Sequence, residues 1–160
     1  MTNLLFMAVM YSSEELLNKS KSDLIKKYGP IKAEGHVYDF SFTNYYEPEM
    51  GKNLKKKFII FEKEATKEEL ADVKFFITEI EKKYSNNTGR TVNIDPGYLS
   101  ETELQLATFK EKSFKEKIHE KVWVHKVLEF NGDEIKQFFH TFADYKDKKN
   151  QEFILKNKPK

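Results

Sequence analysis

Residues 4–10 of the chain are Leu-Leu-Phe-Met-Ala-Val-Met, and residues 58–61 are Phe-Ile-Ile-Phe. In both segments apolar side chains fill consecutive positions, so they would face both sides of a β-sheet. A strand that is apolar on both faces is typical of the interior of a sheet. The two segments therefore predict strands over 3–11 and 57–62 that lie side by side at the centre of one sheet.

The rest of the chain changes between helical and strand patterns, with breaks at Gly, Pro and Asn. A Ser100–Glu103 capping pattern predicts the start of a further helix, and Asn131-Gly132 predicts a type I′ hairpin turn. The predicted elements are, in order, a helix over 12–28, a strand over 31–42, a loop over 43–53, a helix over 66–84, a strand over 90–95, a short helix over 100–107, a segment over 109–120 that fits either helix or loop, and a hairpin of strands over 120–130 and 133–139.

This order predicts an α+β fold with a ferredoxin-like β-α-β-β-α-β core, extended by a short helix and a C-terminal β-hairpin. In such a core the first and third strands are central, and both helices cover one face of the sheet. The other face is left for the hairpin or for a second subunit, as in a homodimer. We expect a single domain over 1–145 and a polar, lysine-rich tail over 146–160.

Composition excludes several classes of protein. The chain has 160 residues and no cysteine, which excludes disulfides, thiolate nucleophiles and cysteine-based zinc sites. Its net charge of +2 is far from the basic excess of a dedicated nucleic-acid binder. No apolar stretch approaches the roughly 18 residues that span a bilayer, and no signal peptide is recognisable. We therefore expect a cytoplasmic protein without a membrane partner.

Three segments together resemble a known family. They are Thr43–Tyr46 running to Glu49–Gly51, Asn93–Leu99 (Asn-Ile-Asp-Pro-Gly-Tyr-Leu), and Leu106–Lys110. With Thr141–Tyr145, they resemble a prokaryotic family known only as a domain of unknown function. The resemblance spans nearly the whole chain and implies no activity, substrate or catalytic residue.

Members of that family are sometimes labelled GTP-binding proteins, and the sequence does not support this label. A P-loop requires G-x-x-x-x-G-K followed by Ser or Thr. The nearest candidate is Gly51-Lys52, where Tyr46 replaces the first glycine and Asn53 replaces the Ser or Thr. A nucleotide site of the P-loop type is therefore not predicted.

Polar residues near the strand over 90–95 and the loop over 43–53 are the candidates for a site. Asn93 and Asp95 would project from one face of the strand, with Asp95 at its end beside the Pro96-Gly97 turn. The structural alternative is that Asp95 caps this turn. Arg90 has a planar fork that suits phosphate or carboxylate, although an ordinary surface ion pair is an alternative.

The predicted core places the loop over 43–53 and the start of the fourth strand at one end of the sheet. Glu49 and Arg90 would then share a site easily, whereas Asp95 would lie at the other end. Glu49 would meet Asp95 only if the loop folded across the open face of the sheet.

The first hypothesis is a protein that binds a small anionic or phosphorylated molecule, with or without catalysis. Its catalytic candidates are Asp95 and Glu49, and its ligand-binding candidates are Tyr45, Arg90, Asn93, Tyr98 and Lys110. No cofactor and no transition-metal site is predicted, although Mg²⁺ at Asp95 is compatible with the sequence. The alternative is a non-catalytic module that binds RNA or protein through the open sheet face. The structural reading of Lys55–Lys57, against a role in RNA binding, is a solvated strand edge that lysine protects from pairing.

Overall fold

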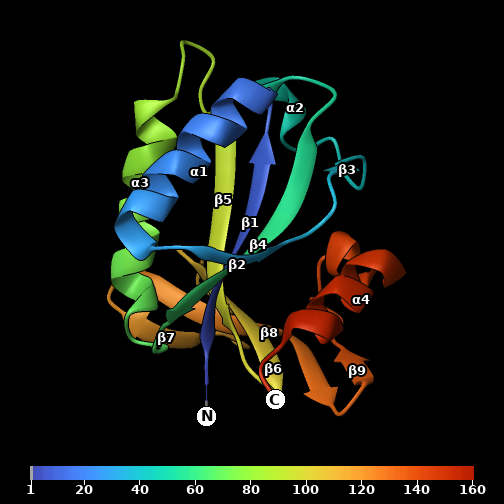
Figure 1. Ribbon diagram of the computed structural model, residues 1–160. Coiled ribbons are helices and arrows are strands. Elements are labelled where there is room, and N and C mark those ends of the chain that lie inside the picture. The colour runs from blue at the N-terminus through green and yellow to red at the C-terminus, as the bar shows by residue number, and fades with distance from the viewer. Residues whose placement is uncertain (1) are drawn as a thin grey trace.

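The two apolar segments are adjacent strands inside one sheet, as predicted. The computed structural model describes residues 2–160. In it β1 (Leu4–Tyr11) is buried along its whole length and pairs antiparallel with β4 (Lys55–Glu64). Both strands have neighbours on both edges, because β2 and β3 pair with β4 on its other edge and β5 pairs with β1 (Figure 1).

Over residues 2–160 the fold is α+β, with a nine-stranded antiparallel open sheet and four α-helices. The other strands are β2 (Ile31–Glu34), β3 (Tyr38–Asp39), β5 (Val92–Leu99), β6 (Glu103–Thr108), β7 (Glu116–His119), β8 (Val122–Asn131) and β9 (Glu134–Gln137). The helices are α1 (Glu14–Tyr28), α2 (Glu47–Met50), α3 (Leu70–Lys83) and α4 (Lys148–Asn157), with a 3-10 helix η1 (Ala143–Lys146) before α4.

The strand order is β2-β4-β1-β5-β6-β8-β7, with β3 on β4 and β9 on β8. This order differs from that of a four-stranded ferredoxin-like sheet, because β6, β8 and β7 continue the sheet beyond β5. The expected strand over 31–42 is also two short strands, β2 and β3. The ferredoxin-like classification is therefore not confirmed for the chain.

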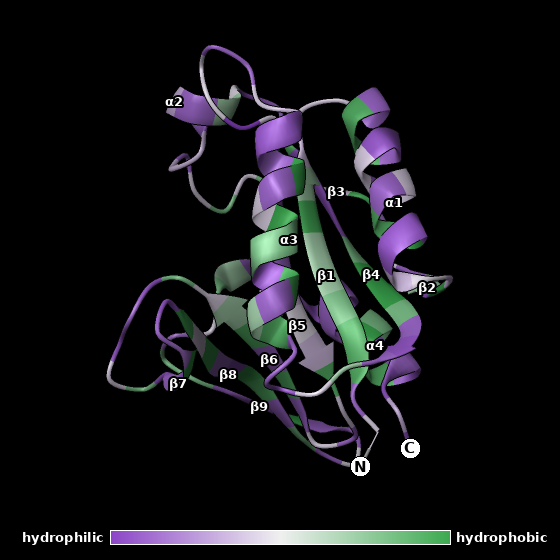
Figure 2. Ribbon diagram, turned by 90° about the vertical axis from the view of Figure 1, so that its left-hand side faces the viewer, coloured by the Kyte–Doolittle hydropathy of each residue, from purple (hydrophilic) through white to green (hydrophobic). Residues whose placement is uncertain are grey.

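Helices cover both faces of the sheet. α1 and α3 lie over one face, and η1 and α4 lie over the other (Figures 1 and 2). On the second face Tyr145 of η1 stacks on Phe58 of β4 with ring centroids 5.0 Å apart, and Ile154 of α4 is buried in the same cluster. The polar, lysine-rich segment 146–160 therefore contains a helix that contributes to the core.

The predicted helix over 100–107 is wrong, because residues 100–102 form a turn and the residues after it belong to β6. Ser100 does accept hydrogen bonds from the backbone N–H groups of Thr102 and Glu103, at 3.2 and 3.1 Å. These bonds shape a tight turn from β5 into β6 instead of a helix start. Beyond the turn, Leu104 and Leu106 alternate with polar residues, and β6 pairs with β8. Strand periodicity thus overrides the capping pattern.

The C-terminal hairpin is confirmed as β8 and β9, but its turn differs from the prediction. Asn131 pairs with Glu134, so the two turn residues are Gly132 and Asp133. Of these only Gly132 has a positive φ, at 62°. A type I′ turn needs positive φ at both positions, so this turn is of another type. Segment 109–120, whose structure the sequence left open, contains β7 at its end.

The sequence predicts that Pro96-Gly97 ends the strand over 90–95. This prediction is wrong, because β5 continues through both residues to Leu99. All eight residues of β5 pair with β1. Gly97 also lets β6 approach closely, since a Cβ atom there would lie 1.9 Å from the carbonyl oxygen of Gln105. Among residues 2–160, no helix has the length and apolar character required to cross a bilayer.

Candidate functional site

β5 and β6 separate along part of their length, and a cavity lined by several of the predicted site residues lies at this split. Backbone pairing joins only Gly97–Leu99 to Leu104–Leu106. Toward the start of β5, the N–H of Ile94 donates instead to a carboxylate oxygen of Glu81 on α3, at 2.8 Å. Pro96 lies on the same edge two residues later, where its missing N–H leaves no donor unpaired.

A cavity of about 510 Å³ lies over this split. Side chains from β5, β6, β8 and from the loops around 45–46 and 109–115 line it. Its charged lining residues comprise one carboxylate and five cations. The carboxylate is Asp95, and the cations are Lys74, Arg90, Lys110, Lys112 and Lys115.

Four polar side chains form a continuous chain of hydrogen bonds that ends at the cavity. The Arg90 guanidinium donates to both carboxylate oxygens of Glu49, at 2.9 and 3.0 Å, and to Oδ1 of Asn93 at 2.6 Å. Because Asn93 accepts through its oxygen, its amide nitrogen is directed to Oδ2 of Asp95, at 3.5 Å. Arg90 therefore orients Asn93, and Asn93 in turn orients Asp95.

The expected pairing of Glu49 with Arg90 is present, and it occupies both residues. The backbone N–H of Arg90 also donates to Glu49 at 2.8 Å, and these bonds lower the pKa of the Glu49 carboxyl. Gly89 makes room for this contact, since a Cβ atom there would lie 2.5 Å from Cγ of Glu49. Glu49 is thus held as a support for Arg90, and the geometry leaves Asp95 as the better-placed acid or base.

The expected position of Asp95 at the far end of the strand is wrong. Asp95 is the fourth residue of β5 and lies in its middle, because the strand runs from Val92 to Leu99. Tyr45 and Tyr46 of the loop over 43–53 line the same cavity as Asp95, whereas Glu49 does not line it. The hydrogen-bond chain through Arg90 and Asn93 links Glu49 to Asp95.

The lysines of the cavity form no ion pair with a carboxylate of residues 2–160, although the charge of Lys74 acts on Glu81 of α3. Among residues 2–160, no carboxylate lies within ion-pair distance of Lys74, Lys110, Lys112 or Lys115. Lys115 donates to the carbonyl oxygen of Lys110 at 3.1 Å. Burial, and then repulsion from Lys110 and Lys112, lowers the pKa of its amine. The lining of the cavity thus carries more positive than negative charge.

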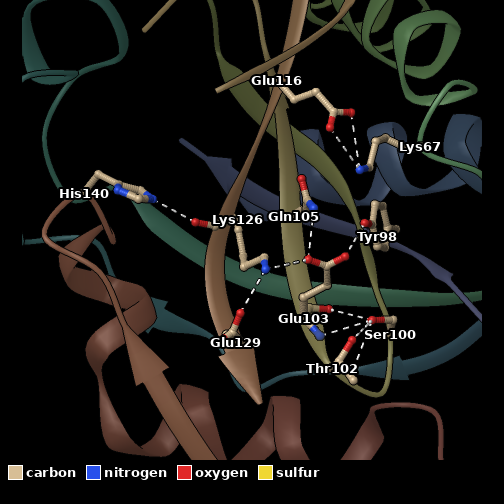
Figure 3. A network of polar contacts seen from close by, with 10 residues as sticks. All are labelled: Lys67, Tyr98, Ser100, Thr102, Glu103, Gln105, Glu116, Lys126, Glu129 and His140. Carbon is tan, nitrogen blue, oxygen red and sulfur yellow. Dashed lines mark hydrogen bonds and ion pairs between the residues drawn. The ribbon is translucent and has the colours of Figure 1, made fainter. Parts of the chain in front are cut away.

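Two histidines line the part of the cavity nearest β8. His140 donates through Nε2 to the carbonyl oxygen of Lys126 at 2.8 Å (Figure 3). The ring of His140 also stacks on that of Phe114, with ring centroids 4.1 Å apart. His125 is buried, and its ring lies 6.0 Å from that of His140. Burial, followed by the charge of Lys115, lowers the pKa of His125 from 6.5 to about 4.

The low pKa of His125 predicts an acid-sensitive stability. In the unfolded chain the imidazole takes up a proton near pH 6.5, whereas in the folded protein it does so near pH 4. Between these values the unfolded state binds more protons, so the free energy of unfolding falls as pH falls, by up to about 1.4 kcal/mol per pH unit. Urea unfolding at several pH values in this window should show the slope, and His125→Asn should reduce it. An unchanged slope in the variant would assign the acid sensitivity to other groups.

Tyr98 does not belong to the cavity. Because β5 is continuous, Tyr98 lies an odd number of residues from Asp95 and faces the opposite side of the sheet. Its hydroxyl donates to Glu103 at 2.6 Å (Figure 3). Glu103 also accepts from Gln105 at 3.0 Å and pairs with Lys126 at 3.4 Å. Tyr98 therefore stabilises the junction of β5, β6 and β8.

The sheet face required by the RNA-binding alternative is largely covered. Lys55–Lys57 are not an exposed edge, because β4 pairs on both sides. Lys56 is buried and forms an ion pair of 2.7 Å with Asp144. Phe58, which would offer a ring for base stacking, lies beneath Tyr145. In residues 2–160, no group of three or more His, Asp or Glu side chains is placed to hold a metal ion.

Comparison with known proteins identifies the family. A family model described as "Domain of unknown function (DUF4416)" matches residues 1–159. The chain belongs to the DUF4416 family. No curated protein and no solved structure matches the chain.

Sequence reasoning on this DUF4416 protein found part of the cavity and missed part. Tyr45, Arg90, Asn93, Asp95 and Lys110 all line it. The missed lining residues include two lysines and both histidines of the cavity. They are Lys112, Lys115, His125 and His140. A usable signal was present in residues 109–115, where lysines alternate with Phe109 and Phe114.

Proposed function

We propose that this DUF4416 protein binds a small anionic molecule, of the phosphorylated class, in the cavity between β5 and β6. The observation that supports the proposal is the set of four lysines that line the cavity and form no ion pair with a carboxylate of residues 2–160. Like charges held close together destabilise the folded state, and a bound anion would remove that repulsion. Each ammonium group also offers three hydrogen-bond donors to phosphate oxygens.

Asp95 would have a different role from the lysines. It is the only carboxylate among the lining residues, and Asn93 directs a hydrogen bond to just one of its oxygens. The other oxygen would then accept a hydrogen bond or a proton from the bound molecule, as a general base does. Arg90 would act as a positioning residue, because Glu49 and Asn93 occupy its guanidinium.

Charge-removing variants test the proposal. The double variant Lys110→Gln/Lys115→Gln is expected to bind phosphates about 10- to 100-fold more weakly, since a hydrogen bond to a charged group is worth about 1.5–3 kcal/mol. The probes are inorganic phosphate, pyrophosphate and glycerol 3-phosphate, measured by titration calorimetry and by the rise in Tm. The matched control Lys52→Gln/Lys63→Gln removes the same charge from exposed positions outside the cavity and should bind like the parent. Equal binding by both double variants would contradict the proposal.

We also propose that residues 4–99 form a ferredoxin-like unit to which the remaining strands are added. The antiparallel order β2-β4-β1-β5, with α1 and α3 on one face, supports this reading. The cavity would then lie at the junction between this unit and the extension of β6, β8 and β7. The extension would supply the histidines, and its long β6–β7 connection would supply most of the lysines.

A further inference from the structure

Aromatic rings at the cavity are exposed to a degree that is unusual for large apolar side chains. Tyr45 is 67% exposed, Phe142 is 49% exposed and Phe109 is 41% exposed, and all three line the cavity. Single exposed apolar residues are common on protein surfaces, but exposed rings gathered around one cavity indicate a binding surface. A site that binds an anion through lysines alone does not require exposed aromatic rings around it.

The cationic groups of the cavity lie next to aromatic rings. The ammonium nitrogen of Lys110 is 5.6 Å from the centre of the Tyr45 ring, and that of Lys74 is 5.1 Å from the centre of the Phe109 ring. These distances are those of cation–π contacts. An anion bound by Lys110 or Lys74 would therefore place the rest of its molecule within reach of an exposed ring.

We infer that the ligand of the proposed site carries a planar aromatic ring joined to its anionic group. This inference rests on the proposed function and narrows it to aromatic phosphates and carboxylates. A ring of the ligand would stack on Tyr45, Phe142 or Phe109 and remove apolar surface from water. The cavity, at about 510 Å³, falls within the usual size range of drug-sized ligand sites and is far larger than a phosphate ion needs.

The experiment compares two phosphate esters of equal charge and similar size. Phenyl phosphate is expected to bind about 5- to 160-fold more tightly than cyclohexyl phosphate, since stacking on an aromatic side chain is worth about 1–3 kcal/mol. The same comparison is made between adenosine monophosphate and ribose 5-phosphate, which differ by a base. Calorimetry gives the affinities, and intermolecular NMR contacts between ligand and side-chain ring protons locate the bound ring.

Variants that each remove one aromatic ring test where the ring of the ligand binds. Tyr45→Leu and Phe142→Leu should each reduce the affinity for phenyl phosphate by a larger factor than the affinity for cyclohexyl phosphate or inorganic phosphate. Phe42→Leu is the matched control, because Phe42 is 43% exposed and does not line the cavity. The Tm of each variant without ligand shows whether it is folded, and the NMR contacts of the parent protein do not depend on any variant.

The possible outcomes separate the inference from the proposed function. Equal affinities for the two esters would overturn the inference and leave anion binding intact. Failure of every phosphate to bind would overturn both. A concentration-dependent dimer that protects Tyr45 and Phe142 from solvent would show that a second copy of the chain covers the rings, and would also overturn the inference. A preference of about fivefold or more that the Tyr45→Leu change reduces would support it.

Discussion

Gly97→Ala is expected to lower the free energy of unfolding by about 3 kcal/mol or more. The added methyl group would lie 1.9 Å from the carbonyl oxygen of Gln105 and 2.9 Å from its carbonyl carbon. Both atoms belong to the backbone of β6, which cannot rotate away as a flexible side chain would. Relief therefore requires β5 and β6 to move apart at the last point where they pair. Urea denaturation, with the free energy extrapolated to water, measures the loss.

Gly35→Ala is the matched control for that change. A Cβ atom at Gly35 would approach its nearest neighbours, in Phe153 and Phe58, at 3.5 Å, which is ordinary van der Waals contact. We expect its effect to stay within about 1 kcal/mol. If Gly97→Ala were as mild as Gly35→Ala, β5 and β6 would not approach as closely as described, and the geometry of the split would need revision.

Local patterns in the sequence identified most elements but not their extent. The central strands and the helices α1 and α3 follow from patterns of consecutive or periodic apolar residues. β6 was missed because its turn uses the same side-chain bonds as a helix cap, and only pairing with β8, far along the chain, distinguishes the two. The passage of β5 through Pro96-Gly97 was missed because the local sequence resembles a turn. The glycine is needed for another reason, since the backbone of Gln105 in β6 leaves no room for a Cβ atom at position 97.

In the candidate site, too, local sequence patterns did not identify contacts between residues that are distant in the chain. The ion pair of Glu49 with Arg90 could be anticipated, because the expected sheet places the loop and the strand start at one end. Tyr98 was grouped with Asp95 because both lie in one distinctive segment, but strand alternation places them on opposite faces. The histidines could not be found from spacing, since His125 and His140 meet only through the packing of β8 against the segment after β9.

Asp144→Asn is expected to lower the free energy of unfolding by about 3–5 kcal/mol. The side chains of Lys56 and Asp144 are only 7% and 3% exposed and form an ion pair of 2.7 Å. Tyr38 donates its hydroxyl to the same carboxylate oxygen at 2.7 Å. The amide keeps the shape of the carboxyl group but leaves the Lys56 ammonium buried without a counter-charge. Because Asp144 lies in η1, the loss should also loosen α4, which hydrogen exchange of its amides would detect.

Two comparisons assign that effect to the uncompensated buried charge. Asp39→Asn breaks the exposed pair of Asp39 with Lys55, and it should change stability by less than about 1 kcal/mol because water already screens that pair.

Adding Lys56→Met to Asp144→Asn removes the unpaired ammonium group and should restore part of the lost stability, since a buried pair can be replaced by apolar groups at little net cost. If the double variant were less stable than Asp144→Asn alone, the contacts of Lys56 with the rings of Phe40 and Tyr145, at 4.9 and 5.5 Å, would dominate over its charge. The buried lysine would then stabilise the face under α4 by packing on aromatic rings, independently of Asp144.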